Sequence, residues 1–310
     1  MTELADPGRG RGETFLRESA KRALHGYGLA SASWRAHPDF LLIGAKRGGT
    51  TSLWRYLSEH PDVLDLFPRP EKLKGLYYFD EQYGRGDRWY RSHFPMRGRR
   101  DRPTARGIPT VVGEATPYYL YHPLAPTRAA SAVPDAQILV VLRDPVERAY
   151  SHYKERRAND TEPLSFAAAV AAEDDRLTGE EQRIVAEPGY VSFAHRHCSY
   201  LDQGRYAPML ERWFAAYGRD RVQVEISEEM YADPQAMLDR VTERLGIRHH
   251  QLRDTSVHNA EPARDFDPAI RAELAERLAP AVRATEELLG RDLPWARPAG
   301  RRPTCRTGTT

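Results

Sequence analysis

The sequence predicts an α/β fold in which helices flank a mostly parallel central sheet. Short apolar runs alternate with amphipathic helical patterns along most of the 310 residues. The run QILVVL at 137–142 is continuously apolar, as expected of a parallel strand covered on both faces. A glycine-containing turn at 45–49 follows another apolar run and leads into a helical pattern, which is the local arrangement of a phosphate-binding loop.

The individual elements follow in chain order from the same patterns. In the first half of the chain they are a strand at 40–43, a helix at 51–59, a strand at 110–113, a helix at 126–132, a strand at 137–142 and a helix at 145–157. In the second half they are a helix at 206–218, a strand at 222–227 and helices at 233–246 and 267–290. The last two helices each begin with Asp-Pro, a cap followed by a favoured first residue, and each ends at a glycine.

The composition limits the classes of function. The chain carries 46 Lys and Arg against 44 Asp and Glu, a net charge of +2, which argues against a nucleic-acid-binding protein. No apolar run is long enough to cross a membrane, so no integral membrane segment is expected. The two cysteines lie far apart, which favours a reducing, cytoplasmic setting over a disulfide framework. The abundance of Arg and Ala is typical of a high-GC bacterial gene.

The chain divides into three expected regions. Residues 1–36 are charged and contain glycines, and we expect a flexible N-terminal arm there, with a short helix near 13–24. Residues 37–295 are expected to form a single domain, and 296–310 a disordered C-terminal tail. The charged segment 173–183 inside the domain is expected to be a solvated loop, with a lid over the substrate as the alternative. The sequence does not specify an oligomeric state.

The turn after the first strand has the composition of an anion-binding site. Two basic residues, two glycines and three hydroxyl-bearing residues occupy seven consecutive positions: Lys46, Arg47, Gly48, Gly49, Thr50, Thr51 and Ser52. The glycines allow the backbone to approach an anion, and the first turn of the helix presents unpaired amides and the positive end of its dipole. No lysine directly follows the last glycine, as it does in the common nucleoside triphosphate loop. The segment therefore predicts a cradle for a phosphate or a similar tetrahedral anion, with a plain connecting turn as the alternative.

A second basic motif follows the strand at 137–142. Arg143 stands at the carboxyl end of this strand, where a parallel sheet presents functional side chains, and Ser151 lies about two turns into the next helix. Arginine grips a phosphate with two parallel donors, and a serine hydroxyl adds a third. Asp144 has two interpretations, as a magnesium ligand of a nucleoside triphosphatase or as a helix cap. Because Pro145 follows it, the cap is favoured.

Together the two motifs resemble those of the sulfotransferases that use 3′-phosphoadenosine 5′-phosphosulfate (PAPS). LLIGAKRGGTTSL, at 41–53, resembles the 5′-phosphosulfate loop of that family. ILVVLRDPVERAYSHY, at 138–153, resembles its 3′-phosphate motif. The segments 77–95, 113–123 and 288–295 are similar to the heparan-sulfate-type carbohydrate sulfotransferases and their bacterial relatives, so that the similarity covers about 39–295.

The resemblance implies a P-loop-like sulfotransferase fold and transfer of a sulfuryl group from PAPS without a metal. The acceptor is expected to be a hydroxyl, with an amine as the alternative, on a carbohydrate, a glycolipid or a glycosylated natural product. The resemblance assigns Arg143 and Ser151 to the nucleotide 3′-phosphate and Lys46 to the bridging oxygen and the sulfonate. It also suggests that Arg264 closes over the nucleotide, unless this residue is a plain surface arginine. A magnesium-dependent P-loop kinase and a catalytically silent nucleotide-binding relative stay open as alternatives.

The catalytic base of the resembling family has no counterpart at its usual position. In the heparan-sulfate type a glutamate follows the lysine of a K-E-x-H-F-F-D-like segment. The corresponding segment here is KGLYYFD at 74–80, and Gly75 occupies the position of the glutamate. Lys74 is either a pocket residue or a solvated surface lysine. The substitute bases considered are Glu71, Asp80, Glu114 and His122. Glu114 is favoured because it directly follows a predicted strand and is expected to face the cleft.

Overall fold

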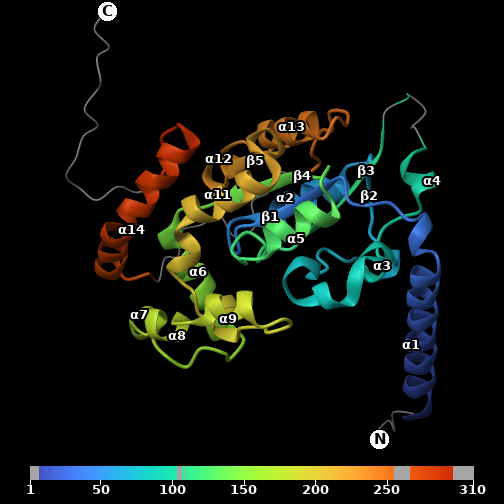
Figure 1. Cartoon of the computed structure of the whole chain (residues 1–310), viewed down its shortest axis with the longest axis horizontal. Helices are drawn as coiled ribbons and strands as arrows, with labels where there is room; N and C mark the ends of the chain where they lie inside the picture. Colours follow the sequence, from blue (N-terminus) through green and yellow to red (C-terminus); the bar gives the residue numbers. More distant parts are fainter. Residues whose placement is uncertain (1–6, 103–106, 108, 255–265, 296–310) are drawn as a thin grey trace, which may run out of the picture.

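The computed structural model describes residues 7–102, 107, 109–254 and 266–295. In this part of the chain five strands form one parallel sheet in the order β2–β3–β1–β4–β5 (Figure 1). The strands are β1 (Phe40–Gly44), β2 (Val63–Leu64), β3 (Val111–Ala115), β4 (Gln137–Leu142) and β5 (Val222–Ile226). The α/β fold with a parallel sheet, predicted from the apolar runs, is confirmed.

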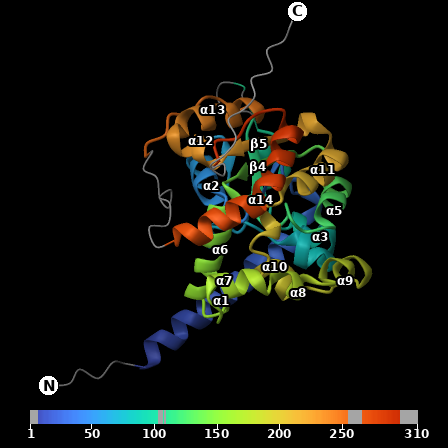
Figure 2. The same cartoon turned by 90° about the vertical axis from the view of Figure 1, so that its left-hand side faces the viewer.

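Helices cover both faces of this sheet. In chain order they are α1 (Pro7–Ala30), α2 (Thr50–Glu59), α3 (Gly86–Arg91), α4 (Arg97–Arg100), α5 (Ala125–Ala132), α6 (Pro145–Ala158), α7 (Phe166–Ala171), α8 (Glu173–Leu177), α9 (Glu180–Ala186), α10 (Phe193–His197), α11 (Tyr206–Tyr217), α12 (Ser227–Ala232), α13 (Pro234–Arg244) and α14 (Pro268–Leu289). Figure 2 shows α14 crossing α6 at one side of the molecule.

The core follows from the alternation of side chains along the strands. On β1, Phe40 and Leu42 pack in one apolar cluster together with residues of α2 and α13. Leu41 and Ile43 point to the opposite face and join a second cluster with residues of α5 and α11. Because both faces of the strand are buried, its sequence is apolar at every position except the final glycine, as expected of an interior parallel strand.

Most of the predicted elements are confirmed to within two residues, because they are marked by local signals. Asp144 caps α6 by accepting hydrogen bonds from the amides of Val146 and Glu147. Asp233 and Asp267 cap α13 and α14 in the same way, and α14 ends at the left-handed Gly290. The interpretation of Asp144 as a helix cap is thus confirmed. The two-residue strand β2 was not predicted, since it is too short to give a period.

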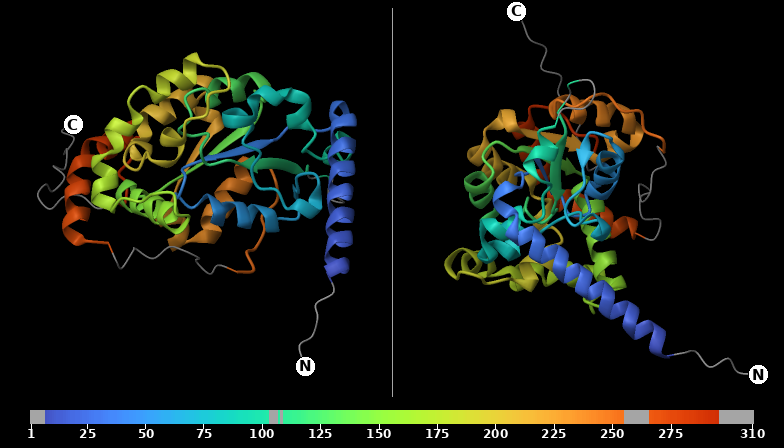
Figure 3. Two further views of the ribbon diagram at one scale, coloured as in Figure 1. Left: turned by 90° about the horizontal axis from the view of Figure 1, so that it is seen from below. Right: turned by 90° about the vertical axis from the view of Figure 1, so that its right-hand side faces the viewer.

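The described part of the N-terminal segment, for which a flexible arm with a short helix is expected, contains a long helix. The N-terminal residues 7–30 form the helix α1, which projects from the domain at its N-terminal end and rests against it at the other (Figure 3). His25 Nε2 lies 2.9 Å from Glu71 Oε1, and the guanidinium of Arg35 lies over the ring of Phe67 at 4.0 Å. These contacts are between residues far apart in sequence, so the glycine-rich composition gave no sign of them. Residues 1–6 and the tail 296–310 lie outside the described residues.

The charged segment 173–183 is not the solvated loop that its composition predicted. It contains α8 and the start of α9, and Glu173 is buried. The carboxylate of Glu173 accepts hydrogen bonds from the amides of Leu201 and Asp202. Burial raises the pKa of this carboxyl to about 7, against the opposing effect of those amide donors. The segment therefore belongs to a small helical layer, α7 to α10, that lies beyond α6 (Figure 1).

Candidate active site

The glycine turn lies at the carboxyl end of β1, an interior strand of the sheet. Gly49 has a φ of 103° and immediately precedes the first residue of α2. A Cβ atom on Gly48 would lie 2.5 Å from the carbonyl oxygen of Val141, so only glycine allows the turn to sit this close to β4. The turn therefore directs the first amides of α2 and the hydroxyls of Thr50, Thr51 and Ser52 toward one place.

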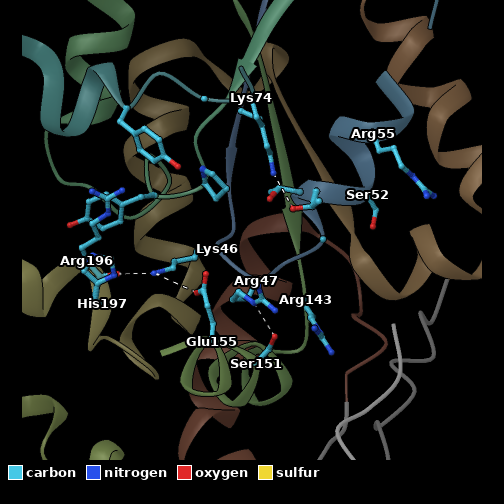
Figure 4. A pocket seen from close by; sticks show the side chains of 18 of the residues that line it. Lys46, Arg47, Ser52, Arg55, Lys74, Arg143, Ser151, Glu155, Arg196 and His197 are labelled. Atoms are coloured by element: carbon cyan, nitrogen blue, oxygen red, sulfur yellow. Dashed lines mark hydrogen bonds and ion pairs between the residues drawn. The ribbon is translucent and has the colours of Figure 1, made fainter. Parts of the chain in front are cut away.

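The second motif faces the same place from β4 and α6. Arg143 follows β4, and Ser151 lies on α6, where its Oγ accepts a hydrogen bond from Arg47 Nε at 3.1 Å. This contact joins the two motifs, which are about a hundred positions apart in sequence. Arg143 Nη2 also lies 4.0 Å from Glu147 Oε2, and its side chain is largely shielded from solvent. Figure 4 shows Arg47, Arg143 and Ser151 gathered at one end of the pocket.

A cavity of about 390 Å³ connects these groups. Of the residues predicted to bind the donor, those that line it are Lys46, Arg47, Gly49, Thr50, Thr51, Ser52, Arg143 and Ser151. Gly48 lies behind the turn, against β4. Arg264 lies outside the described residues. The volume suits a small-molecule ligand, and the lining is dominated by cations and hydroxyls, which suits an anionic one.

Lys46 is the most perturbed cation of the cavity. Its Nζ donates a hydrogen bond to the carbonyl oxygen of Arg196 at 3.2 Å and lies 4.0 Å from Glu155 Oε2. Burial lowers the pKa of Lys46 to about 7, an effect that Glu155 opposes and that Arg156 and Arg196 reinforce. The ammonium is thus held in a site that an anionic ligand would stabilise.

Lys74, which the sequence left undecided, lines the cavity. Its Nζ donates a hydrogen bond to Thr51 Oγ1 at 3.1 Å across the glycine turn. Burial lowers the pKa of Lys74 to about 8. The neighbouring Gly75 is fixed against the end of β3, because a Cβ atom there would lie 2.4 Å from the carbonyl oxygen of Ala115. No side chain fits at this position without movement of the backbone.

The structure places Glu114 away from the cavity, contrary to the expectation that it faces the cleft. Its side chain is fully buried and accepts hydrogen bonds from the Leu76 amide and from the hydroxyls of Tyr90, Thr116 and Tyr119. Burial raises the pKa of the Glu114 carboxyl, and these four donors oppose the increase. The carboxylate holds the segment after Gly75 onto β3, and this geometry argues against a role as the base.

The other substitutes considered from the sequence also lie outside the cavity lining. Glu71 is engaged by His25 and Lys21 of α1, at 2.9 and 3.6 Å. Burial raises the pKa of Asp80 to about 7, and this side chain accepts a hydrogen bond from the amide of Glu81. Burial lowers the pKa of His122 to about 3. The location of these residues could not be read from sequence, because it depends on how 70–95 and the segment after β3 fold onto the sheet.

Several residues that line the cavity were not singled out in the sequence. They are Arg55, Gly75, Tyr77, Ala115, Pro117, Tyr118, Glu155, Arg156, Arg196, His197 and Tyr231. Glu155 had a usable signal, because it lies one helical turn after Ser151 and therefore on the same face of α6. Arg196 and His197 lie on α10, and no local pattern ties that helix to the glycine turn. Arg196 pairs with Glu81, and its guanidinium carbon lies 5.0 Å from the centroid of the Tyr77 ring.

Comparison with protein families agrees with this geometry. Residues 37–262 match the family model described as the sulfotransferase domain, which is well over half of the chain. The chain belongs to the sulfotransferase family. The interpretation of the two anion motifs as those of the PAPS-dependent sulfotransferases is thereby confirmed at the level of the family, and the protein is a sulfotransferase by fold and by descent.

Curated relatives of this sulfotransferase include multidomain enzymes of heparan sulfate. The bifunctional heparan sulfate N-deacetylase/N-sulfotransferase 4 of Mus musculus is 31% identical over 234 residues, covering 74% of this chain and 24% of the mouse protein. The bifunctional heparan sulfate N-deacetylase/N-sulfotransferase of Drosophila melanogaster is 28% identical over 229 residues, covering 71% of this chain and 20% of that protein. The sulfotransferase thus spans about a quarter or less of the length of these relatives.

A solved structure supports the fold over 83% of this chain. The crystal structure of a sulfotransferase from Alicyclobacillus acidocaldarius is 31% identical, with a TM-score of 0.62, and the match covers 83% of this chain and 98% of that one. Within the described residues of the sulfotransferase, no three His, Cys, Asp or Glu side chains cluster in a way that could hold a metal. No helix in the same residues is long and apolar enough to span a bilayer.

Proposed function

We propose that this sulfotransferase transfers a sulfuryl group from PAPS to a hydroxyl group of a carbohydrate, a glycolipid or a glycosylated natural product. One observation carries the proposal. Two anion-binding motifs, the glycine turn with Lys46 and the pair Arg143 and Ser151, line the same cavity and touch through Arg47. A donor with phosphate groups at both the 3′ and the 5′ position of its ribose needs two such motifs in this relation, whereas a magnesium triphosphate needs a lysine directly after the last glycine.

Different residues of the cavity are suited to different groups of the donor. Arg143 and Ser151 are suited to the 3′-phosphate, because a guanidinium and a hydroxyl give several parallel donors to one phosphate group. The amides of the first turn of α2, with Thr50 and Thr51, are suited to the 5′-phosphate. Lys46 is then left to stabilise the charge that develops on the bridging oxygen as the sulfuryl group departs.

The acceptor class is supported by the relatives. The curated relatives are named as heparan sulfate N-sulfotransferases, which supports a glycan acceptor and keeps an amine as the second candidate beside a hydroxyl. The end of the cavity farther from Arg143 and Ser151, where Figure 4 shows Arg196, is suited to the acceptor. The guanidinium of Arg196 lies over the rings of Tyr77 and Tyr118, which also line the cavity. Aromatic and cationic side chains of this kind suit a sugar ring that carries a negative charge.

Calorimetry with 3′,5′-ADP and with ATP–magnesium tests the donor. We expect 3′,5′-ADP to bind without metal and ATP–magnesium to bind far more weakly. Arg143→Ala should weaken 3′,5′-ADP binding by about 10- to 100-fold, because a charge-assisted hydrogen bond contributes roughly 1.5–3 kcal/mol. Arg205→Ala is the matched control, since this exposed arginine lies outside the cavity. Preference for ATP–magnesium would instead identify a kinase.

Turnover is tested separately from binding. Donor labelled with ³⁵S is incubated with glycans that present free hydroxyls or free amines, and transfer of label to the glycan is measured. Tight binding of 3′,5′-ADP combined with no consumption of PAPS, with or without these acceptors, would mean that the protein is a silent nucleotide-binding relative.

A further inference from the structure

Sulfuryl transfer to a hydroxyl requires a group that removes the proton of the acceptor. Gly75, which lines the cavity beside Lys74, has no side chain to offer and no room for one. Among the described residues that line the cavity, Glu155 carries the one carboxylate. We propose that Glu155 is the general base of this sulfotransferase, an inference that rests on the proposed function. The assignment is supported by the position of the carboxylate, by the incomplete hydrogen bonding of its oxygens and by the unsuitability of His197.

The position of Glu155 is set by α6. Ser151 and Glu155 are four residues apart, so both side chains leave the same face of the helix and enter the cavity. Figure 4 shows Ser151 directed toward Arg47 and Glu155 directed toward Lys46, away from Arg143. A single helix thus supplies one residue to the nucleotide end of the cavity and one to the end where sulfur is transferred.

The carboxylate oxygens of Glu155 are only partly engaged. Oε2 is buried, lies 4.0 Å from Lys46 Nζ and has no hydrogen-bond partner within the described part of the chain. Oε1 lies 3.5 Å from Arg156 Nη2. Both separations are longer than a good charge-assisted hydrogen bond. The oxygen beside Lys46 therefore keeps the capacity to accept a proton from a ligand that enters the cavity.

The distance to Lys46 places the carboxylate at the reacting centre. Lys46 is the cation suited to the bridging oxygen of the donor, and an acceptor oxygen attacks sulfur from the side opposite to that bond. A base must lie within hydrogen-bond reach of the attacking oxygen, which is itself a few ångströms from the bridging oxygen across the sulfur. A carboxylate adjacent to the lysine, on the side of Arg196 and His197, satisfies this condition.

His197 is the histidine of the cavity lining, and it is poorly suited to the task. Arg156 Nη1 lies 2.8 Å from His197 Nδ1, which occupies that nitrogen as an acceptor. Burial, together with the nearby charges of Lys46, Arg156 and Arg196, lowers the pKa of His197 to about 3. A histidine surrounded by three cations resists the charge that it would gain on taking a proton.

The proposed step is a displacement at the sulfur atom of the donor. The acceptor oxygen forms a bond to sulfur while the bond from sulfur to the bridging oxygen breaks, and the electron pair of that bond stays on the 5′-phosphate of 3′,5′-ADP. The proton of the acceptor hydroxyl moves to Glu155 Oε2 and later leaves to solvent. Lys46 stabilises the new charge on the phosphate. Water in place of the acceptor would give sulfate and 3′,5′-ADP by the same step.

The variant Glu155→Gln tests this assignment with the full-length protein. The probe is the conversion of PAPS into 3′,5′-ADP, measured without acceptor, where water takes its place, and with the glycan panel. We expect kcat to fall by about 10²- to 10⁴-fold, the usual contribution of a general base. The Kd for 3′,5′-ADP should change by less than about threefold. Glu155→Asp should recover part of the rate, and Glu187→Gln, at an exposed ion-paired site outside the cavity, should retain all of it.

The possible results distinguish a failure of the Glu155 assignment from a failure of the proposed function. Wild-type turnover together with an unchanged kcat in Glu155→Gln would overturn the assignment and leave the sulfotransferase function standing. A parallel loss of 3′,5′-ADP affinity and rate would also overturn it, because Glu155 would then act only by holding Lys46 in place. Wild-type protein that binds 3′,5′-ADP but does not consume PAPS would overturn the proposed function and the base together.

Discussion

Replacing Lys46 by methionine should stabilise the unliganded protein at low pH more than at high pH. Burial lowers the pKa of Lys46 from its ordinary value of 10.5 to about 7. Between these values the unfolded chain binds the proton more tightly than the folded one, so the stability of the wild type rises with pH. From pH 6 to pH 9 this one group contributes an increase of roughly 3 kcal/mol in the free energy of unfolding.

Urea unfolding of both proteins at pH 6 and pH 9 measures this effect. All other titrating groups are shared, so the stability difference between Lys46→Met and the wild type should shrink by roughly 3 kcal/mol from pH 6 to pH 9. Lys154→Met, at an exposed position on the same helix as Glu155, is the control for the loss of one lysine. A difference for Lys46→Met that is equal at both pH values would refute the claim that the ammonium is desolvated.

Three further outcomes are expected. Binding of 3′,5′-ADP at pH 8 should take up protons, because the anion raises the pKa of Lys46 and of Lys74; calorimetry in two buffers of different ionisation enthalpy should show less uptake in Lys46→Met than in the wild type, and equal uptake would contradict the role of Lys46. Glu114→Ala should lower the free energy of unfolding by roughly 3–5 kcal/mol in urea melts, since four buried donors lose their acceptor, and an unchanged midpoint would contradict this. Gly75→Ala should cost roughly 1–3 kcal/mol because its Cβ would lie 2.4 Å from the Ala115 oxygen, whereas Gly98→Ala, whose Cβ meets nothing within 4 Å, should be neutral in the same assay.

The strands of the sheet, the capped helices and the nucleotide end of the cavity could be predicted from local patterns in the sequence. These features are local. Residues 137–142 are apolar without interruption, Asp144 lies directly before a proline, and the seven residues from Lys46 to Ser52 are contiguous. Each pattern is complete within a few positions, so the chemistry that it specifies does not depend on distant parts of the chain.

The chemistry at the other end of the cavity depends on how distant segments pack together. Glu114 and Glu155 are both acidic residues near a predicted strand or helix, and nothing local distinguishes them. The fold of 70–95 onto β3 buries Glu114 among four donors, and the packing of α6 and α10 around the glycine turn leaves Glu155 beside Lys46. A carboxylate acts as a base or as a structural acceptor according to the groups that surround it, and those groups come from segments far apart in sequence.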